Sequence, residues 1–376
     1  MKKSYVKLYL IELLLFFIFI LNSFVSSILN QYNMVIFLVV AIIIIKLMFG
    51  IERDRHRYTK DVMIEIIIYL LFYFILYYIS GLFFSFARTG NYYTWYGLKN
   101  FIVPAALIVI SKEILRNMIL TKSEGNKMLI IVTCILFVFL DITNAIYYNR
   151  FETKYETFLF IALYLLPAIS SNALCTYISI KNGYKPVILY LMILRLYPYL
   201  LPIVPNPSQY IVSVIDFAAP FLLWRRIYLF YQKEQDREVS RDYHQKRHII
   251  PLITALILVG IMVYFTSGYF HYHAIAVASG SMNPNVKKGD VVVIEKIEGN
   301  YDLLQEGQVI AYRYDGVIIV HRLIKITKYK DHYYFYTKGD ANSREDNWTV
   351  EEDMIIGIIN YKVSYIGWPT VWLNEL

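Results

Sequence analysis

The chain has 376 residues, of which 57% are hydrophobic, and it carries a formal net charge of +8. This composition excludes an ordinary soluble chain, which is roughly 45–50% apolar, and because much of the basic charge lies in short loops between apolar runs, membrane topology is favoured over nucleic-acid binding. The two cysteines, Cys134 and Cys175, both lie within apolar runs, so a disulfide scaffold is not expected and neither supplies a nucleophile or zinc ligand to the C-terminal part.

Nine apolar runs are candidates for transmembrane helices, since a span needs roughly 20 mostly apolar residues. They are residues 8–29, 33–50, 62–86, 100–120, 128–147, 157–180, 187–206, 209–230 and 249–270. The first run follows the basic start MKK, as in a signal peptide, but it is too long and another run follows almost at once, so we expect it to stay uncleaved. The seventh run includes the proline-rich stretch RLYPYLLPIVPNPSQ, which predicts a helix that is kinked or ends early.

Ionisable residues inside these runs are costly in a bilayer and are candidates for function. Lys112, Glu113 and Arg116 interrupt the fourth run and make it the weakest of the spans. Four further residues of this kind stand in other runs: Glu65, Asp141, Arg195 and Asp216. Arg195 and Asp216 lie on successive runs, so we expect a structural ion pair between them. A substrate path or a partner-docking surface is the alternative.

Lysine and arginine are enriched in alternate loops, which orients the spans. With the N-terminus inside, nine spans place everything after residue 270 outside the cytoplasm. The sequence therefore predicts four segments. They are a polytopic transmembrane domain of unknown role at 1–230, a basic cytoplasmic linker at 231–248, a transmembrane anchor at 249–270 and an extracytoplasmic β-rich domain at 271–376.

After residue 270 the pattern changes to short β-branched and aromatic stretches separated by Gly, Asp and Asn, which is typical of strands and turns. The stretches are DVVVIEKI, QVIAYRY, GVIIVHRLIKIT, YYFYTKGD and MIIGIINYKVSYIG. They predict one small domain. The fold class is therefore a membrane protein in which an α-helical polytopic region precedes a small extracytoplasmic all-β domain.

The turn SGSMNP, just before the first of these stretches, presents a candidate nucleophile. Ser281 lies between a glycine and a proline, which favour a tight and rigid turn. A serine hydroxyl needs a base, and His321, at the end of GVIIV, is the best candidate. Asp340 is the first choice to orient this histidine and Asp346 the second. Taken singly, such features are more often an ordinary turn and a structural histidine.

The order of these motifs makes the combination specific. SGSMNP is followed by GDVVV, then by VHRL, then by TKGDAN with Asp346. In this order and spacing, residues 279–346 resemble the type I signal peptidase family, which consists of S26-type serine peptidases. Because a histidine stands in VHRL where the common bacterial branch has a lysine, the chain resembles the Ser–His branch. That branch includes endoplasmic-reticulum, archaeal and sporulation-associated bacterial enzymes.

The resemblance implies roles for the matching positions. Ser281 would be the nucleophile and His321 the general base. Asp340 and Asp346 match the two acidic positions of the branch, and either can orient the histidine. Ser279 matches a position whose hydroxyl helps to hold the oxyanion, together with the Ser281 backbone N–H. The resemblance implies no metal ion and no organic cofactor.

The resemblance also implies a function. We expect a membrane-bound serine endopeptidase that removes N-terminal signal peptides from exported preproteins at the outer membrane surface. Its partners would be preprotein signal peptides, the lipid bilayer and the secretion machinery, without nucleic acid. We expect a multi-pass protein of a plasma membrane, and the Ile-, Tyr-, Asn- and Lys-rich composition suggests a bacterium with an AT-rich genome. The alternative is a catalytically inactive membrane assembly or transport protein with a retired peptidase domain.

Overall fold

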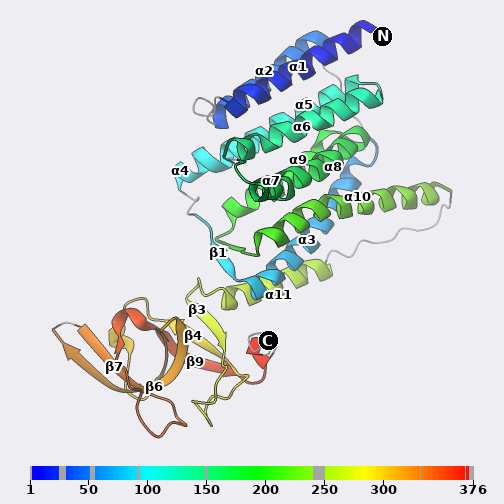
Figure 1. Cartoon of the computed structure of the whole chain (residues 1–376). Coiled ribbons are helices and arrows are strands. Elements are labelled where there is room, and N and C mark those ends of the chain that lie inside the picture. Colours follow the sequence, from blue (N-terminus) through cyan, green and yellow to red (C-terminus); the bar gives the residue numbers. More distant parts are fainter. Residues whose placement is uncertain are drawn as a thin grey trace. The chain divides into compact units, whose positions relative to one another are not determined.

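The computed structural model describes residues 2–24, 31–50, 56–90, 94–148, 151–239, 250–330, 332–368 and 370–371. The chain divides into two compact units, Met1–Leu256 and Ile257–Leu376. The first unit is helical and the second carries a seven-stranded sheet (Figure 1). An α-helical region followed by a β domain is thus confirmed.

Helices account for most of the first unit. They are α1 (Lys2–Phe24), α2 (Gln31–Phe49), α3 (Thr59–Phe84), α4 (Trp95–Gly97), η1 (Leu98–Ile102), α5 (Val103–Lys122), α6 (Lys127–Tyr148), α7 (Lys154–Phe160), η2 (Ile161–Leu165), α8 (Leu166–Asn182), α9 (Tyr184–Leu200) and α10 (Gln209–Val239). A further helix, α11 (Ile250–Thr266), crosses the boundary between the units. Two short strands, β1 (Phe86–Arg88) and β2 (Ile203–Pro205), pair antiparallel.

Each of the nine predicted runs overlaps a helix or a series of consecutive helices among the described residues. In this part of the chain, three helices are long and apolar enough to cross a membrane: Gln31–Phe49, Thr59–Gly81 and Lys154–Asn182. A shorter apolar helix covers Ile253–Thr266. Candidate spans are therefore supported for three of the runs, and the count of nine stays a prediction.

The proline-rich stretch ends its helix early, as predicted. α9 stops at Leu200, and Leu201 is already extended. Pro202 has no backbone N–H to donate and its ring disfavours the helical conformation at the preceding residue, which favours the end of the helix at this point. The chain instead enters strand β2.

The predicted linker is partly helical. α10 continues to Val239, so residues 231–239 extend that helix. The rest of the predicted linker, 240–248, lies outside the described residues.

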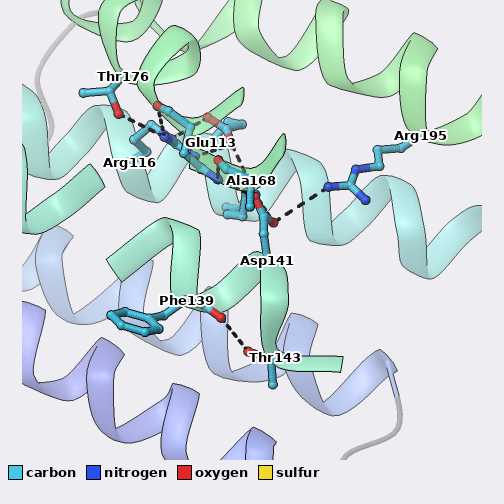
Figure 2. A network of polar contacts seen from close by, with 10 residues as sticks. Glu113, Arg116, Phe139, Asp141, Thr143, Ala168, Thr176 and Arg195 are labelled. Carbon is cyan, nitrogen blue, oxygen red and sulfur yellow. Dashed lines mark hydrogen bonds and ion pairs between the residues drawn. The ribbon is translucent and has the colours of Figure 1, made fainter. Parts of the chain in front are cut away.

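One ion pair in the helical unit differs from the expected one. Arg195 lies 4.0 Å from Asp141 on α6, and among the described residues no ion pair joins it to Asp216. The side chain of Arg195 reaches toward Asp141, as Figure 2 shows. Glu65 pairs with Arg226 of α10, with 2.8 Å between Oε2 and the guanidinium. The predicted Arg195–Asp216 pair is therefore replaced by a contact with Asp141.

The second unit is built on one antiparallel sheet. Its strands are β3 (Tyr272–Ala276), β4 (Val291–Lys296), β5 (Val309–Tyr314), β6 (Val317–Tyr329), β7 (His332–Lys338), β8 (Val350–Glu351) and β9 (Ile355–Val363). Their order across the sheet is β3-β4-β9-β5-β6-β7-β8. All five stretches predicted as strands contain one, while β3 and β8 were not predicted.

Two clusters of buried side chains stabilise this sheet. The first includes Met282, Val292 and Val320, and the second includes Leu323 and Phe335. β6 contributes Val320 to the first cluster and Leu323 to the second. Packing on both sides therefore fixes the position of this strand in the sheet. This strand carries His321.

Candidate active site

Ser281 lies in the loop between β3 and β4, and buried neighbours hold that loop against the sheet. Met282, only 1% exposed, and Val286 belong to the apolar cluster that includes β4. The Val286 backbone N–H donates to the Met282 carbonyl oxygen at 2.9 Å. The loop is therefore packed in place, while the Ser281 side chain stays partly accessible.

His321 is placed by the hairpin of β5 and β6. The two turn residues, Asp315 and Gly316, have φ angles of 46° and 79°. This is the left-handed conformation that a two-residue type I′ turn requires, and Asp-Gly is a favoured sequence for it. The turn sets the register in which His321 pairs with Ile310. The histidine side chain is only 8% exposed.

Three side chains form a continuous chain of contacts. His321 Nε2 lies 3.2 Å from Ser281 Oγ, and His321 Nδ1 lies 2.6 Å from Asp346 Oδ2. When Nδ1 donates to the carboxylate, Nε2 carries a free lone pair that faces the serine hydroxyl. A serine, a histidine and an aspartate in this order of contacts form the arrangement of a serine hydrolase.

Two hydroxyl groups hold Asp346 in this position. Thr337 Oγ1 donates to Asp346 Oδ2 at 2.7 Å, and the Tyr312 hydroxyl donates to the same oxygen at 3.2 Å. Burial raises the pKa of Tyr312 to about 12, so this hydroxyl keeps its proton at neutral pH. The Asp346 backbone N–H also bonds to the Thr337 carbonyl oxygen at 2.9 Å. Asp346 therefore has both its backbone and its side chain tied to β7.

Asp340 is bound to a different partner. Arg322 donates from Nε to Oδ1 and from a terminal nitrogen to Oδ2, both at 2.7 Å, which is a bidentate pair. Asn285 donates to Oδ2, also at 2.7 Å. The hydrogen bonds from Arg322 are the main reason that the pKa of Asp340 is lowered. Asp340 thus links the loop of the candidate nucleophile to β6.

The turn after β7 lies directly against the serine. The Ala341 backbone N–H donates to the Ser281 carbonyl oxygen at 2.9 Å. A Cβ atom at Gly339 would lie 2.6 Å from the same oxygen, closer than atoms can approach without a shift. Glycine at this position therefore allows the approach of the two segments.

Ser279 also lies beside the candidate nucleophile. Its hydroxyl oxygen is 3.2 Å from Ser281 Oγ, and the residue is exposed. Among the described residues, no hydrogen bond uses the backbone N–H of Ser281. The Ser279 hydroxyl and this N–H are therefore two donors close to the serine oxygen.

The structure brings Ser279, Ser281, His321 and Asp346 together, and it connects Asp340 to Arg322. Of the two aspartates, Asp346 contacts His321, whereas the sequence favoured Asp340. The sequence interpretation missed Tyr312, Thr337 and Arg322, all of which support the two aspartates. Arg322 and Thr337 belong to the motifs VHRL and TKGDAN, so the motifs contained the signal. Tyr312, in the middle of β5, carried none.

Comparisons with known proteins relate the C-terminal part of the chain to signal peptidases. The family model for signal peptidase, peptidase S26, matches residues 247–333. Signal peptidase I W of Bacillus subtilis (strain 168) is 34% identical over 123 residues, covering 32% of this chain and 61% of that protein. The signal peptidase complex catalytic subunit SEC11 of Plasmodium falciparum (isolate 3D7) is 28% identical over 134 residues, covering 33% and 70%.

A third relative is also the catalytic subunit of a signal peptidase complex. The catalytic subunit SEC11 of Yarrowia lipolytica (strain CLIB 122 / E 150) is 27% identical over 143 residues, covering 32% of this chain and 81% of that protein. The resemblance to S26-type signal peptidases is therefore confirmed for the C-terminal part of the chain. Residues 1–246 and 334–376, the latter with Asp340 and Asp346, lie outside the family match.

Proposed function

We propose that the C-terminal unit is a serine endopeptidase that removes N-terminal signal peptides from exported preproteins. The observation that carries the proposal is the chain of contacts from Ser281 through His321 to Asp346. It occurs in a domain similar to proteins whose names state signal peptidase activity. The proposed steps use side chains of this unit, the Ser281 backbone N–H and water.

In the first half of the reaction, Ser281 Oγ attacks the carbonyl carbon of the scissile peptide bond. Its proton passes to His321 Nε2, which lies 3.2 Å away. The imidazolium that forms is stabilised by the Asp346 carboxylate on Nδ1. His321 then delivers the proton to the leaving amine, the C–N bond breaks, and the signal peptide stays attached to Ser281 as an ester.

In the second half, water replaces the amine. The oxygen of the water molecule attacks the ester carbon while His321 takes a proton from that water. The bond to Ser281 Oγ breaks and the proton returns to that oxygen. The products are a free signal peptide and the mature protein, and the enzyme returns to its starting state.

Negative charge develops on the carbonyl oxygen in both halves. The Ser279 hydroxyl and the Ser281 backbone N–H are the proposed donors to this oxygen. The Ser279 hydroxyl lies 3.2 Å from Ser281 Oγ, and in this step its O–H points to the developing oxyanion instead of to Oγ. Such donors act in the transition state, and each is typically worth about 10²–10³-fold in rate.

The proposed place of action is the outer surface of a plasma membrane, in a multi-pass protein of bacterial origin. Ser281 lies close in sequence to the end of α11 at Thr266. The basic segment before α11 supports an inside position for the start of this helix and an outside position for the β domain after it. A signal peptide spans the same bilayer and would present its cleavage site there. The proposed partners are the preprotein, the bilayer and the secretion machinery.

The proposal is tested by replacing Ser281 with alanine in cells that depend on this protein. We expect preproteins to accumulate with their N-terminal signal peptides attached, detected by mass spectrometry of protein N-termini. Ser343→Ala, which changes an exposed serine of the same unit, is the matched control and leaves processing unchanged. Normal processing in the Ser281→Ala cells would refute the proposal and favour the alternative of an inactive membrane assembly or transport protein.

A further inference from the structure

The helical unit contains a cavity of about 370 Å³ that the peptidase proposal does not use. Residues of α3, α6, η2, α8, α9 and α10 line it. Six of the lining residues matter here: Tyr73, Asp141, Tyr190, Arg195, Tyr197 and Asp216. The volume lies at the lower end of the roughly 300–1,000 Å³ found for sites of small ligands.

The charges beside this cavity are already balanced. Lys112 Nζ lies 2.5 Å from Asp141 Oδ1, and Asn172 donates to Asp141 Oδ2 at 2.7 Å. Arg116 lies 2.9 Å from Glu113. Two cations and two carboxylates therefore compensate one another. Figure 2 shows this network with Arg116 at one end and Arg195 at the other.

Arg116 is enclosed by its neighbours. Its guanidinium donates to the Asn172 carbonyl and side-chain oxygens, to Thr176 and to Glu113. The Phe137 ring covers one face, with 4.3 Å from the guanidinium carbon to the ring centroid. Arg116 is fully buried, connects α5 to α6 and α8, and does not line the cavity.

Arg195 and Asp216 are the two charges of the cavity that remain. Arg195 is 4.0 Å from Asp141, beyond the roughly 2.7–2.9 Å of a charge-assisted hydrogen bond, and its side chain is 58% exposed. Asp216 is also exposed, and within the described part of the chain no hydrogen bond reaches its carboxylate. A second cavity, of about 240 Å³, shares Asp141, Leu191 and Arg195 with the first. Arg195 therefore borders two open spaces.

Arg195 and Asp216 face the same cavity and, within the part of the chain that the structure describes, do not bond each other. A cation and an anion placed in this way complement a molecule that carries both charges. If these helices span the membrane, exposure of the two charges to lipid would be costly, and a polar ligand or water in the cavity would avoid that cost. Tyr73, Tyr190 and Tyr197 also line the cavity, and tyrosine rings can attract an ammonium group. Neither a simple anion nor a simple cation would use all these features.

We propose that this cavity binds a small zwitterion, with its anionic group on the Arg195 guanidinium and its ammonium group between the Asp216 carboxylate and the tyrosine rings. A free amino acid and the headgroup of phosphatidylethanolamine both present this chemistry. The site lies wholly within the helical unit and does not depend on the proposed peptidase activity.

Full-length protein, purified in detergent without zwitterionic lipid, allows the two sources to be tested separately. In one arm, glycine is titrated and its heat of binding is measured. In the other, retention of dioleoylphosphatidylethanolamine is compared with that of dioleoylphosphatidylglycerol by native mass spectrometry. We expect glycine to bind, or phosphatidylethanolamine to be retained preferentially. Binding of glycine would identify a free amino acid as the source, and preferential retention of the lipid would identify the headgroup. The proposal is overturned if glycine does not bind and phosphatidylethanolamine is not retained preferentially.

Variants then test the residues. We expect Asp216→Asn and Arg195→Gln each to weaken binding by about tenfold or more, since each removes one charge-assisted contact. Ser171→Leu, which fills the cavity without changing a charge, should weaken it similarly. Glu65→Gln removes a carboxylate that pairs with Arg226 outside this lining, and it should leave binding unchanged.

Two results contradict the assignment. If acetate or methylammonium, which carry one charge each, compete as well as glycine, the site does not recognise a zwitterion. If Asp216→Asn binds as tightly as the unaltered protein, Asp216 is not the ammonium partner. Because Asp216 forms no described hydrogen bond, its replacement keeps the test decisive even if Arg195→Gln fails to fold.

Discussion

Asp346 Oδ2 lies 2.6 Å from His321 Nδ1, and the exposed fractions of the two side chains are 5% and 8%. A charge-assisted bond of this length, shielded from water, fixes the imidazole ring and its tautomer. The same carboxylate oxygen accepts the Thr337 hydroxyl. Asp346, which follows β7, and Thr337, which lies on β7, therefore fix the orientation of His321, the proposed base.

The first prediction separates the two aspartates. Asp346→Asn should lower kcat by about 10³–10⁴-fold, because an amide at this place favours the wrong imidazole tautomer. Asp340→Asn leaves the contact between Asp346 and His321 intact, so it should reduce kcat far less. Cleavage of a reconstituted preprotein by the two purified variants measures the difference. Equal losses in both would show that Asp346 has no special role.

The second prediction concerns Tyr312. Tyr312→Phe keeps the buried ring and removes only the hydroxyl that donates to Asp346 at 3.2 Å. Because Thr337 still donates to the same oxygen, we expect a loss of kcat of about tenfold or less, with KM unchanged. Steady-state kinetics with a signal-peptide substrate tests this. A rise in KM alone would place Tyr312 in substrate binding instead.

The third prediction concerns the oxyanion. Ser279→Ala should lower kcat by about 10²–10³-fold with little change in KM, since the donor acts mainly in the transition state. Ser279→Thr keeps a hydroxyl and should retain more activity. Single-turnover cleavage rates compare the two. If both variants cleave like the unaltered protein, the Ser279 hydroxyl does not hold the oxyanion.

The fourth prediction is a pH dependence of stability at the Asp340–Arg322 pair. The hydrogen bonds from Arg322 lower the pKa of Asp340, so the folded state favours the charged carboxylate more than the unfolded state does. This stabilisation is fully present above the ordinary aspartate pKa of about 3.9 and is lost as the pH falls through the lowered value.

Urea unfolding, followed by tryptophan fluorescence, checks this sign. The unaltered protein should be more stable than Asp340→Asn at about pH 7, and the difference should shrink steadily as the pH is lowered below about 4. A difference that stays constant over this range would mean that the charge of Asp340 does not contribute.

The sequence predicted the features that depend on local patterns. Alternating β-branched and aromatic stretches predicted the five longer strands that come after the Ser281 loop. The motifs placed Ser281 and His321, whose contact at 3.2 Å joins residues from different elements. Strands β3 and β8 were missed because they are short, and each depends on a neighbouring strand for its pairing.

The choice between aspartates could not be made from spacing. Asp340 and Asp346 both stand on the connection after β7. Arg322 binds Asp340 from the residue next to His321, which leaves Asp346 as the partner of the histidine. Similarly, the Arg195–Asp141 contact joins helices far apart in sequence, whereas the pattern of runs suggested neighbouring ones. Both outcomes depend on tertiary packing.

The central claim is that Ser281 attacks the peptide bond with His321 as its base. Its most direct test is the rate at which the purified full-length protein cleaves a reconstituted preprotein. Ser281→Ala and His321→Ala are measured beside Ser343→Ala and His332→Ala, which replace exposed residues of the same unit. We predict a single cut that releases the signal peptide, no detectable cleavage by the first two variants, and full activity of the two controls. Undiminished cleavage by folded Ser281→Ala protein would contradict the account.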